Sequence, residues 1–217
     1  MSQDKPHKPS PYVGLNAFRK ADRAYFFGRE KDIALIGDNL QAHRLTILYG
    51  PSGVGKSSVL QAGVIPYLEE VSATNQEKSL IIFLNSWQDN PYEDLQQALK
   101  EKAETLNITL EADEPLALIS HLSEETEVQV YFIFDQFEEY FLYHSEEDLE
   151  SSKGFAYQLV ALCNDLRLNV NVLISLRDDG FALLDRFKGS IPQLFDNYLR
   201  LKKLDRVQPR APSRGRY

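Results

Sequence analysis

Short runs of consecutive apolar residues alternate along this chain with longer stretches in which apolar residues recur every three or four positions. Consecutive apolar positions are typical of strands in a parallel sheet, because helices cover both faces of such a sheet. The alternation therefore predicts a three-layer α/β/α sandwich around a mainly parallel, five-stranded sheet. The predicted strands are 45–49, 80–84, 130–134, 170–175 and a weaker one at 198–204.

The predicted helices carry recognisable end signals. Ahead of the first strand, apolar residues at 33, 35, 36 and 40 fall at near-helical spacing. After the second strand, Asn90 can cap a helix that begins with Pro91, while Glu93 and Asp94 complement the dipole of its first turn. The helix that follows the first strand is expected to stop at Pro66, because proline lacks the amide hydrogen that continues a helix.

Length, composition and charge narrow the class of protein. The 217 residues are enough for one substantial domain, and a net charge of −8 repels nucleic acid and anionic membranes, so neither is expected as a partner. The apolar runs are far shorter than the roughly 18 residues that a membrane span requires. The start of the chain has no stretch resembling a signal peptide, and Cys163 is the single cysteine. A cytoplasmic protein without intrachain disulfides is therefore expected.

Three parts are expected along the chain. Residues 1–11 are polar and rich in proline, which predicts a flexible lead, and residues 12–205, which carry the alternating strand and helix patterns, are expected to form one domain. Residues 206–217 carry four arginines and no acid. This tail is predicted to be disordered, with a basic arm for an acidic partner as the alternative. The acidic run 145–150 is predicted to be the solvated start of a helix.

The stretch that follows the first predicted strand has the spacing G-x-x-x-x-G-K-S of a phosphate-binding loop. Its glycines let successive backbone N–H groups turn inward around an anion, and the following helix directs its N-terminal dipole at the same point. Lys56 is expected to reach the β- and γ-phosphates, and the Ser57 hydroxyl to coordinate Mg²⁺. The expected loop contacts are Gly50, Pro51, Ser52, Gly53, Val54, Gly55, Lys56, Ser57 and Ser58.

Acidic residues follow the most apolar predicted strand. Asp135 ends the run 130–134, at the edge of the sheet where open α/β folds bind ligands, and is expected to hold Mg²⁺ through water. Glu138 and Glu139 follow closely, and one of them is expected to polarise the attacking water as general base. Both are equally explained as acids in the exposed first turn of a helix.

Arg177 ends the fourth predicted strand at the same edge of the sheet. An arginine there can contact the γ-phosphate and report whether it is present. The alternative is a surface ion pair with Asp178 or Asp179.

Five motifs in this order resemble those of the STAND NTPases, and in particular the novel STAND NTPase subgroup of bacterial multidomain proteins. They are "PYVGLNAF", "FFGRE", "GPSGVGKSS", "FDQFEE" and the segment from "SLRDD" to "LKKLD". The resemblance covers about residues 11–205. It implies a sheet of the additional-strand type, in which the strand ending in Arg177 lies between those ending in the phosphate loop and in Asp135.

The resemblance also implies ATP or ADP with Mg²⁺ at the loop, with the adenine near Phe27, Gly28 and Arg29. Related proteins are switches that rest with ADP, bind ATP when a sensor domain is engaged, and often self-associate. Two departures matter: Gln136 stands where many fast ATPases of this class have an acid, and the helical and winged-helix domains of the family do not follow. Protein partners would therefore act through self-association or through sensor and effector domains absent from this sequence.

Three functions are consistent with these residues. The first is an ATP-binding, Mg²⁺-dependent signalling switch with slow or absent hydrolysis. The second is a nucleotide kinase that transfers the γ-phosphoryl group to a nucleoside monophosphate, since "GPSGVGKS" also suits such an enzyme. The third is an interaction module that binds nucleotide without hydrolysing it.

Overall fold

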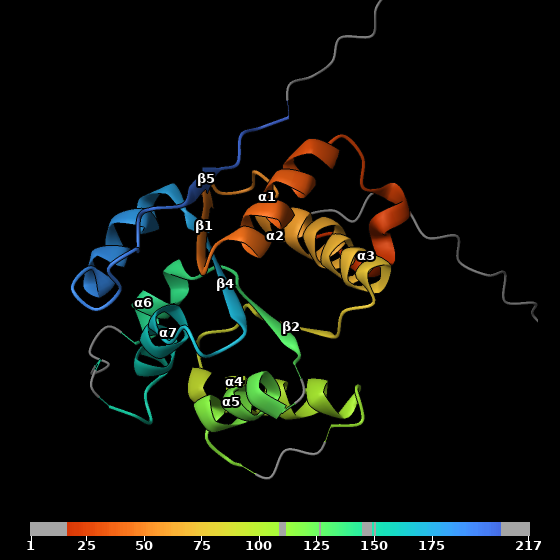
Figure 1. Ribbon diagram of the computed structural model, residues 1–217. Coiled ribbons are helices and arrows are strands. Elements are labelled where there is room, and N and C mark those ends of the chain that lie inside the picture. The colour runs from red at the N-terminus through yellow and green to blue at the C-terminus, as the bar shows by residue number, and fades with distance from the viewer. Residues whose placement is uncertain (1–16, 109–111, 126, 145–148, 150, 205–217) are drawn as a thin grey trace, which may run out of the picture.

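A computed structural model describes residues 17–108, 112–125, 127–144, 149 and 151–204. Five strands form one sheet in the order β2-β3-β4-β1-β5, and every pairing is parallel (Figure 1). The strands are β1 (Leu45–Gly50), β2 (Ser79–Leu84), β3 (Gln129–Phe134), β4 (Val170–Arg177) and β5 (Tyr198–Arg200). The fold class is confirmed, and β4 lies between β1 and β3 as the resemblance implies.

The first four predicted strands are confirmed as β1 to β4, each within one or two residues of its predicted limits. The last run did not extend as far as expected, because only Tyr198–Arg200 pair with β1. The Leu201 N–H donates to the Tyr49 carbonyl, and the chain then continues through the exposed residues Lys202 and Lys203. The predicted strand 198–204 was therefore too long at its carboxyl end.

Helices and helical turns connect the strands. Before β1 come η1 (Lys20–Tyr25) and α1 (Glu30–Ala42), and between β1 and β2 come α2 (Lys56–Val59), η2 (Leu60–Val64) and α3 (Ile65–Asn75). The remaining elements are α4 (Pro91–Glu104), α5 (Pro115–Glu125), α6 (Glu138–Tyr143), α7 (Phe155–Asn164) and η3 (Asp178–Phe187). The predicted cap of α4 is confirmed, because the Asn90 side chain accepts a hydrogen bond from the Tyr92 N–H at 3.2 Å.

The expectation that Pro66 ends the helix after the loop was wrong. The chain stays helical from Lys56 to Asn75, because η2 is a π-turn in which the Ile65 N–H donates to the Leu60 carbonyl. A π-turn widens the helix by one residue, which offers a place for a proline that an ordinary turn would not accommodate. Pro66 then occupies the first turn of α3, where its missing amide hydrogen costs little.

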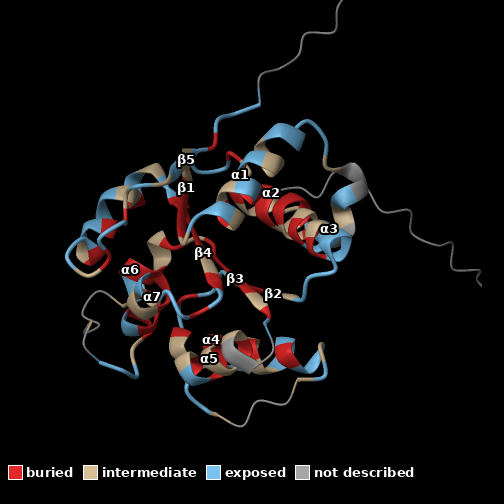
Figure 2. Cartoon of the chain, in the orientation of Figure 1, coloured by how far each residue is buried: buried red, intermediate tan, exposed pale blue. Residues whose placement is uncertain are grey.

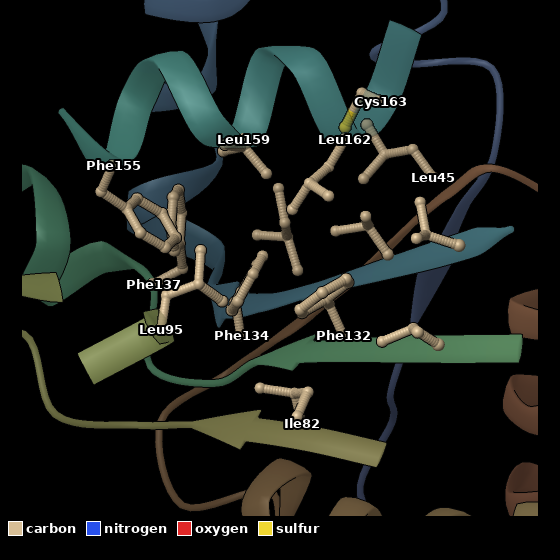
Figure 3. Close-up of a cluster of buried hydrophobic side chains, with 14 of the residues drawn as sticks. Leu45, Ile82, Leu95, Phe132, Phe134, Phe137, Phe155, Leu159, Leu162 and Cys163 are labelled. Carbon is tan, nitrogen blue, oxygen red and sulfur yellow. The ribbon is translucent and has the colours of Figure 1, made fainter. Parts of the chain in front are cut away.

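Two apolar cores lie on opposite faces of the sheet (Figure 2). The first, here called the aromatic core, packs α4, α5, α6, α7 and η3 against one face and includes Phe132, Phe134 and Phe155 (Figure 3). The second, here called the loop-side core, packs α1, α2, η2 and α3 against the other face and is mostly aliphatic. The layers expected from the sequence are therefore present.

Several sequence predictions lie outside the described residues. They concern the lead 1–11, the tail 206–217 and nearly all of the acidic run 145–150. Among the helices that the structure describes, none is both long enough and apolar enough to cross a membrane.

Candidate functional site

The phosphate-loop sequence forms an open turn between β1 and α2. Gly53 and Gly55 have φ angles of 71° and 96°, in the left-handed region that favours glycine. A Cβ atom added at either position would meet nothing within 4 Å, so the space above the loop is clear. Gly50 is constrained differently, because a Cβ atom there would lie 2.7 Å from the Leu201 carbonyl oxygen. The glycines thus keep the loop open above and close to the β5 connection below.

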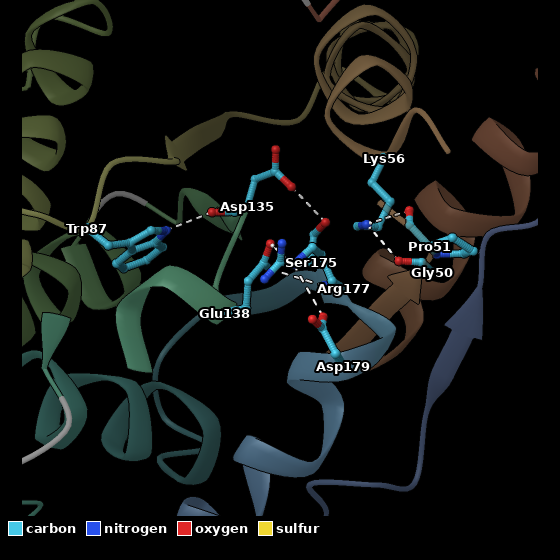
Figure 4. A network of polar contacts seen from close by, with 9 residues as sticks. All are labelled: Gly50, Pro51, Lys56, Trp87, Asp135, Glu138, Ser175, Arg177 and Asp179. Atoms are coloured by element: carbon cyan, nitrogen blue, oxygen red, sulfur yellow. Dashed lines mark hydrogen bonds and ion pairs between the residues drawn. The ribbon is translucent and has the colours of Figure 1, made fainter. Parts of the chain in front are cut away.

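Lys56 begins α2 and folds back over the loop. Its Nζ donates to the Gly50 carbonyl at 2.9 Å and to the Pro51 carbonyl at 3.3 Å (Figure 4). The residue is only 9% exposed. Burial lowers the pKa of its ammonium group, and the Glu138 and Asp135 carboxylates partly offset this effect. A cation kept in such a place lacks a full hydration shell, which favours an anionic ligand above the loop.

Asp135 follows β3 and is fully buried. Its Oδ1 accepts a hydrogen bond from the Ser175 hydroxyl at 2.7 Å, and its backbone carbonyl accepts one from the Trp87 indole Nε1 at 2.8 Å (Figure 4). Its Oδ2 is also buried but has no hydrogen-bond partner among the described residues. An unsatisfied buried carboxylate oxygen is costly, so this atom is well suited to a metal ion or a metal-bound water.

The composition of the site fits magnesium. Among the described residues, no group of three or more histidine, cysteine or acidic side chains could hold a metal on its own. Mg²⁺ does not require such a group, because it usually keeps several waters and binds one or two carboxylates together with substrate phosphates. Asp135 and Ser57, which line the same pocket, supply the ligand types that this arrangement needs.

Arg177 lies at the carboxyl end of β4 and is 46% exposed on its side chain. Its Nε lies 3.2 Å from Glu138 Oε1 and 3.3 Å from Asp179 Oδ1, and its backbone N–H donates to Glu138 Oε2 at 3.1 Å. Both oxygens of Glu138 are therefore engaged by one residue. Gly180 permits this approach, because a Cβ atom there would lie 2.8 Å from the Cβ of Glu138.

Glu139 differs from its neighbour. Within the described part of the chain, its carboxylate makes no hydrogen bond or ion pair. Gln136 precedes both glutamates with a φ angle of 55°, in the left-handed region that side chains rarely adopt, and the Glu139 N–H donates to its carbonyl. Glu139 lines the same pocket as Glu138.

A single pocket of about 480 Å³ brings most of the predicted site residues together. Those lining it are Ser52, Gly53, Gly55, Lys56, Ser57, Ser58, Asp135, Glu138, Glu139 and Arg177. Gly50, Pro51 and Val54 belong to the loop but do not line the pocket. Residues from the loop after β1 and from the carboxyl ends of β3 and β4 thus face one space.

The predicted adenine contacts lie elsewhere. Phe27 is 73% exposed, and neither it nor Gly28 or Arg29 lines the pocket. Arg29 is buried and donates to the Val54 carbonyl at 2.9 Å and to the Lys202 carbonyl at 2.7 Å. It therefore ties the phosphate loop to the chain after β5. No position for the base follows from these three residues.

Several residues that shape the site were not predicted from the sequence. Ala17 and Phe18 line the pocket, and the Phe18 N–H donates to the Ser58 hydroxyl at 3.1 Å. Phe18 is the last residue of the "PYVGLNAF" motif, from which no contact with the site was predicted. The only sequence feature that marks Ser175 is its polar side chain in an otherwise apolar strand. Trp87 is marked only by being the single tryptophan.

The sequence pattern of the family described as Novel STAND NTPase 1 matches residues 11–211. This chain is a member of the novel STAND NTPase family. The family expected from the five motifs is thereby confirmed, and nucleotide binding at a P-loop follows from it. No curated protein sequence matches the chain.

Several solved structures have a similar fold. The ORC2 protein of Aeropyrum pernix, in ADPNP-ADP complexes, matches with a TM-score of 0.61 and 15% identity, over 81% of this chain and 48% of that chain. The ORC1 protein of the same organism, in complex with DNA, gives 0.56 and 15%, over 82% and 46%. A Walker-type ATPase of Pyrococcus abyssi gives 0.52 and 17%, over 89% and 58%. At such identities the likeness concerns the fold, and this STAND chain spans about half the length of these structures.

Proposed function

We propose that this STAND chain is an ATP-binding, Mg²⁺-dependent module that acts as a nucleotide-controlled signalling switch and hydrolyses ATP slowly or not at all. One observation carries the proposal: Lys56, Asp135 and Arg177, which come from three different strand ends, line a single pocket. A phosphate loop, a metal carboxylate and an arginine are the groups that position a triphosphate and neutralise its charge.

Each residue has a distinct role in this proposal. The open loop from Ser52 to Ser58 supplies backbone N–H groups for the phosphates, and Lys56 exchanges its contacts with loop carbonyls for the β- and γ-phosphates. Ser57 and the free oxygen of Asp135 would hold Mg²⁺, which supplies charge neutralisation when bound. Adenine contact by Phe27, Gly28 and Arg29 stays a prediction from the family resemblance.

Discrimination between ATP and ADP is assigned to Arg177. In the structure its Nε lies 3.2 Å from Glu138 Oε1 and 3.3 Å from Asp179 Oδ1. These are partly exposed contacts of modest strength, whereas an arginine bound to a phosphate makes a charge-assisted pair. A γ-phosphate can therefore draw Arg177 away from Glu138, and ADP cannot.

Slow hydrolysis is supported by the acids around the pocket. Glu138 Oε2 accepts a hydrogen bond from the Arg177 backbone N–H, a contact that does not depend on the guanidinium, and Gln136 replaces the acid next to Asp135 with a neutral side chain. Glu139 is the carboxylate left to act as general base. Cytoplasmic location and partners among sensor or effector domains stay predictions.

The proposal is tested by calorimetric titration of ATP and ADP in the presence of Mg²⁺. Lys56→Ala should lower the affinity for ATP at least tenfold, about 1.4 kcal/mol, because it removes the charge facing the phosphates. Lys188→Ala is the control, since Lys188 is exposed and does not line the pocket. Unchanged affinity in Lys56→Ala would reject the phosphate site.

The kinase alternative is separated by adding a nucleoside monophosphate. ADP formation that occurs only when AMP or GMP is supplied would identify a phosphoryl acceptor and overturn the switch. ADP formation at the same slow rate with and without acceptor supports it. No ADP formation under any of these conditions, together with tight ATP binding, would favour the non-hydrolysing module.

A further inference from the structure

A row of side chains on the loop-side face of the sheet changes from apolar to polar at the carboxyl edge. In the parallel register, Ile133 pairs with Leu173, and both belong to the loop-side core. Because strand side chains alternate between faces, Asp135 and Ser175 continue this row two positions further on. Ser175 is also paired with Leu48 of β1, another member of that core. The serine therefore stands between β1, from which the phosphate loop emerges, and Asp135.

The two polar residues form a closed pair. Both are fully buried, and the Ser175 hydroxyl donates to Asp135 Oδ1 at 2.7 Å. A serine hydroxyl has a single hydrogen, so this bond uses its whole donor capacity. The pair satisfies one carboxylate oxygen and leaves Oδ2 without a partner in the described residues. The hydroxyl thereby determines which oxygen remains available.

The backbone of Asp135 is held from the β2 side, and that of Phe137, two residues on, from β4. Its N–H donates to the Leu84 carbonyl at 2.8 Å, and its carbonyl accepts from Trp87 Nε1 at 2.8 Å. The Phe137 N–H donates to the Ser175 carbonyl at 2.9 Å. With the main chain fixed in this way, the carboxylate retains only rotation about its side-chain bonds, and the Ser175 hydroxyl restricts that rotation (Figure 4).

We propose that Ser175 is a positioning residue for the metal site: it orients Asp135 so that Oδ2 faces the bound Mg²⁺ or its water. The inference rests on the proposed function. Residues that hydrogen-bond a metal-binding side chain orient it, and their loss typically lowers metal affinity about ten- to a hundredfold. Ser175 does not touch the nucleotide in this proposal, because it does not line the pocket.

The test measures metal binding rather than turnover. Mg²⁺ is titrated into the full chain in the presence of a fluorescent ATP analogue, and nucleotide affinity is measured separately in EDTA. Ser175→Ala should raise the Mg²⁺ concentration for half-maximal response at least about tenfold, while the affinity in EDTA stays within about twofold of wild type. Ser175→Thr, which keeps the hydroxyl, should restore the wild-type midpoint.

Thr46→Val is the matched control. Thr46 is equally buried in the same sheet, but its hydroxyl donates to the Asn39 carbonyl and lies outside the pocket. Its removal should leave the Mg²⁺ midpoint unchanged. A thermal melt of each variant shows whether the fold is retained. If Ser175→Ala does not fold, Ser175→Cys, which keeps only a weak donor, is titrated instead and should also shift the midpoint upward.

The outcomes are distinguishable. A wild-type chain that binds the ATP analogue equally with Mg²⁺ and with EDTA would overturn both the metal role of Asp135 and this inference. A Mg²⁺-dependent wild type with an unshifted Ser175→Ala or Ser175→Cys would overturn the role of Ser175 alone. A loss of affinity that is equal with Mg²⁺ and EDTA would show a structural role and also overturn it.

Discussion

The two faces of the sheet are covered by cores of different composition, one rich in aromatic side chains and the other mostly aliphatic. On the aromatic side, Trp87 is fully buried and lies edge-on to Phe134, Phe137, Tyr140 and Phe155, with ring centroids 5.1 to 6.0 Å apart. Edge-to-face pairs at these distances add to the stabilisation from burial. The same tryptophan donates to the Asp135 carbonyl, so the aromatic core contacts the backbone of the residue proposed to bind the metal.

The loop side tolerates features that a purely structural core would avoid. Lys56 is buried there, Asp135 Oδ2 has no partner among the described residues, and the helix behind the loop contains a π-turn. Buried charge and unsatisfied oxygen atoms both destabilise a nucleotide-free protein. We infer that the aromatic core contributes most of the stability of the fold. The loop-side core contributes less, because it contains groups suited to binding a ligand.

Removing the centre of the aromatic side should have the largest effect on stability. Trp87→Ala should lower the free energy of unfolding by about 3–5 kcal/mol, as expected for a large buried aromatic. Trp87→Phe keeps most of the packing and should lose only about 1 kcal/mol with the indole hydrogen bond. Urea denaturation measures both. If Lys56→Ala lowered the free energy of unfolding by a comparable amount, the inferred difference in stability between the two cores would be wrong.

The proposed role of Glu139 as general base predicts the next largest effect, which is on the rate of ATP hydrolysis. Glu139→Gln should slow single-turnover ATP hydrolysis about a hundredfold or more, because a neutral amide cannot accept the proton from water. Glu138→Gln should change the rate less, since Glu138 Oε2 accepts a hydrogen bond from the Arg177 backbone N–H even when the guanidinium turns to the γ-phosphate. Indistinguishable time courses from wild type and both variants would remove the general base from the site.

The proposed contact between Arg177 and the γ-phosphate predicts a smaller effect, which is on the affinity for ATP relative to ADP. Arg177→Ala should weaken ATP about tenfold, corresponding to the loss of a charge-assisted hydrogen bond, and ADP much less. The control is Arg167→Ala, which removes an exposed arginine that pairs with Asp165 outside the pocket. Equal losses for the two nucleotides in Arg177→Ala would argue against a γ-phosphate sensor.

Cys163 tests whether the aromatic side stays closed. Burial raises the pKa of its thiol to about 12, so at pH 8 only roughly one molecule in ten thousand carries the reactive thiolate. Native protein should not react with a thiol reagent at pH 8, and unfolding in denaturant should expose the group at once. Addition of ATP and Mg²⁺ should leave the native rate unchanged. Rapid labelling of the native protein would show that this core opens.

Sequence alone determined the elements and the identity of the phosphate loop, for local reasons. Consecutive apolar runs locate the first four strands of the chain, since a strand covered on both faces must be apolar at every position. The Asn90 cap and the loop glycines are likewise encoded by residues that act on their immediate neighbours. The grouping of Lys56, Asp135 and Arg177 at one edge followed from parallel strands that share a direction.

Only the tertiary structure decided which side chains meet. Ser175 lies 40 residues from Asp135 and Trp87 lies 48 residues away, so no local pattern marks these contacts. Arg29, expected near adenine, ties the loop to a carbonyl 173 residues further along the chain. The helix continues past the π-turn and Pro66 because its apolar side chains pack against α1 and the sheet, which outweighs the local preference to stop. Local chemistry names the groups available, but partners distant in sequence determine their orientation and therefore their role.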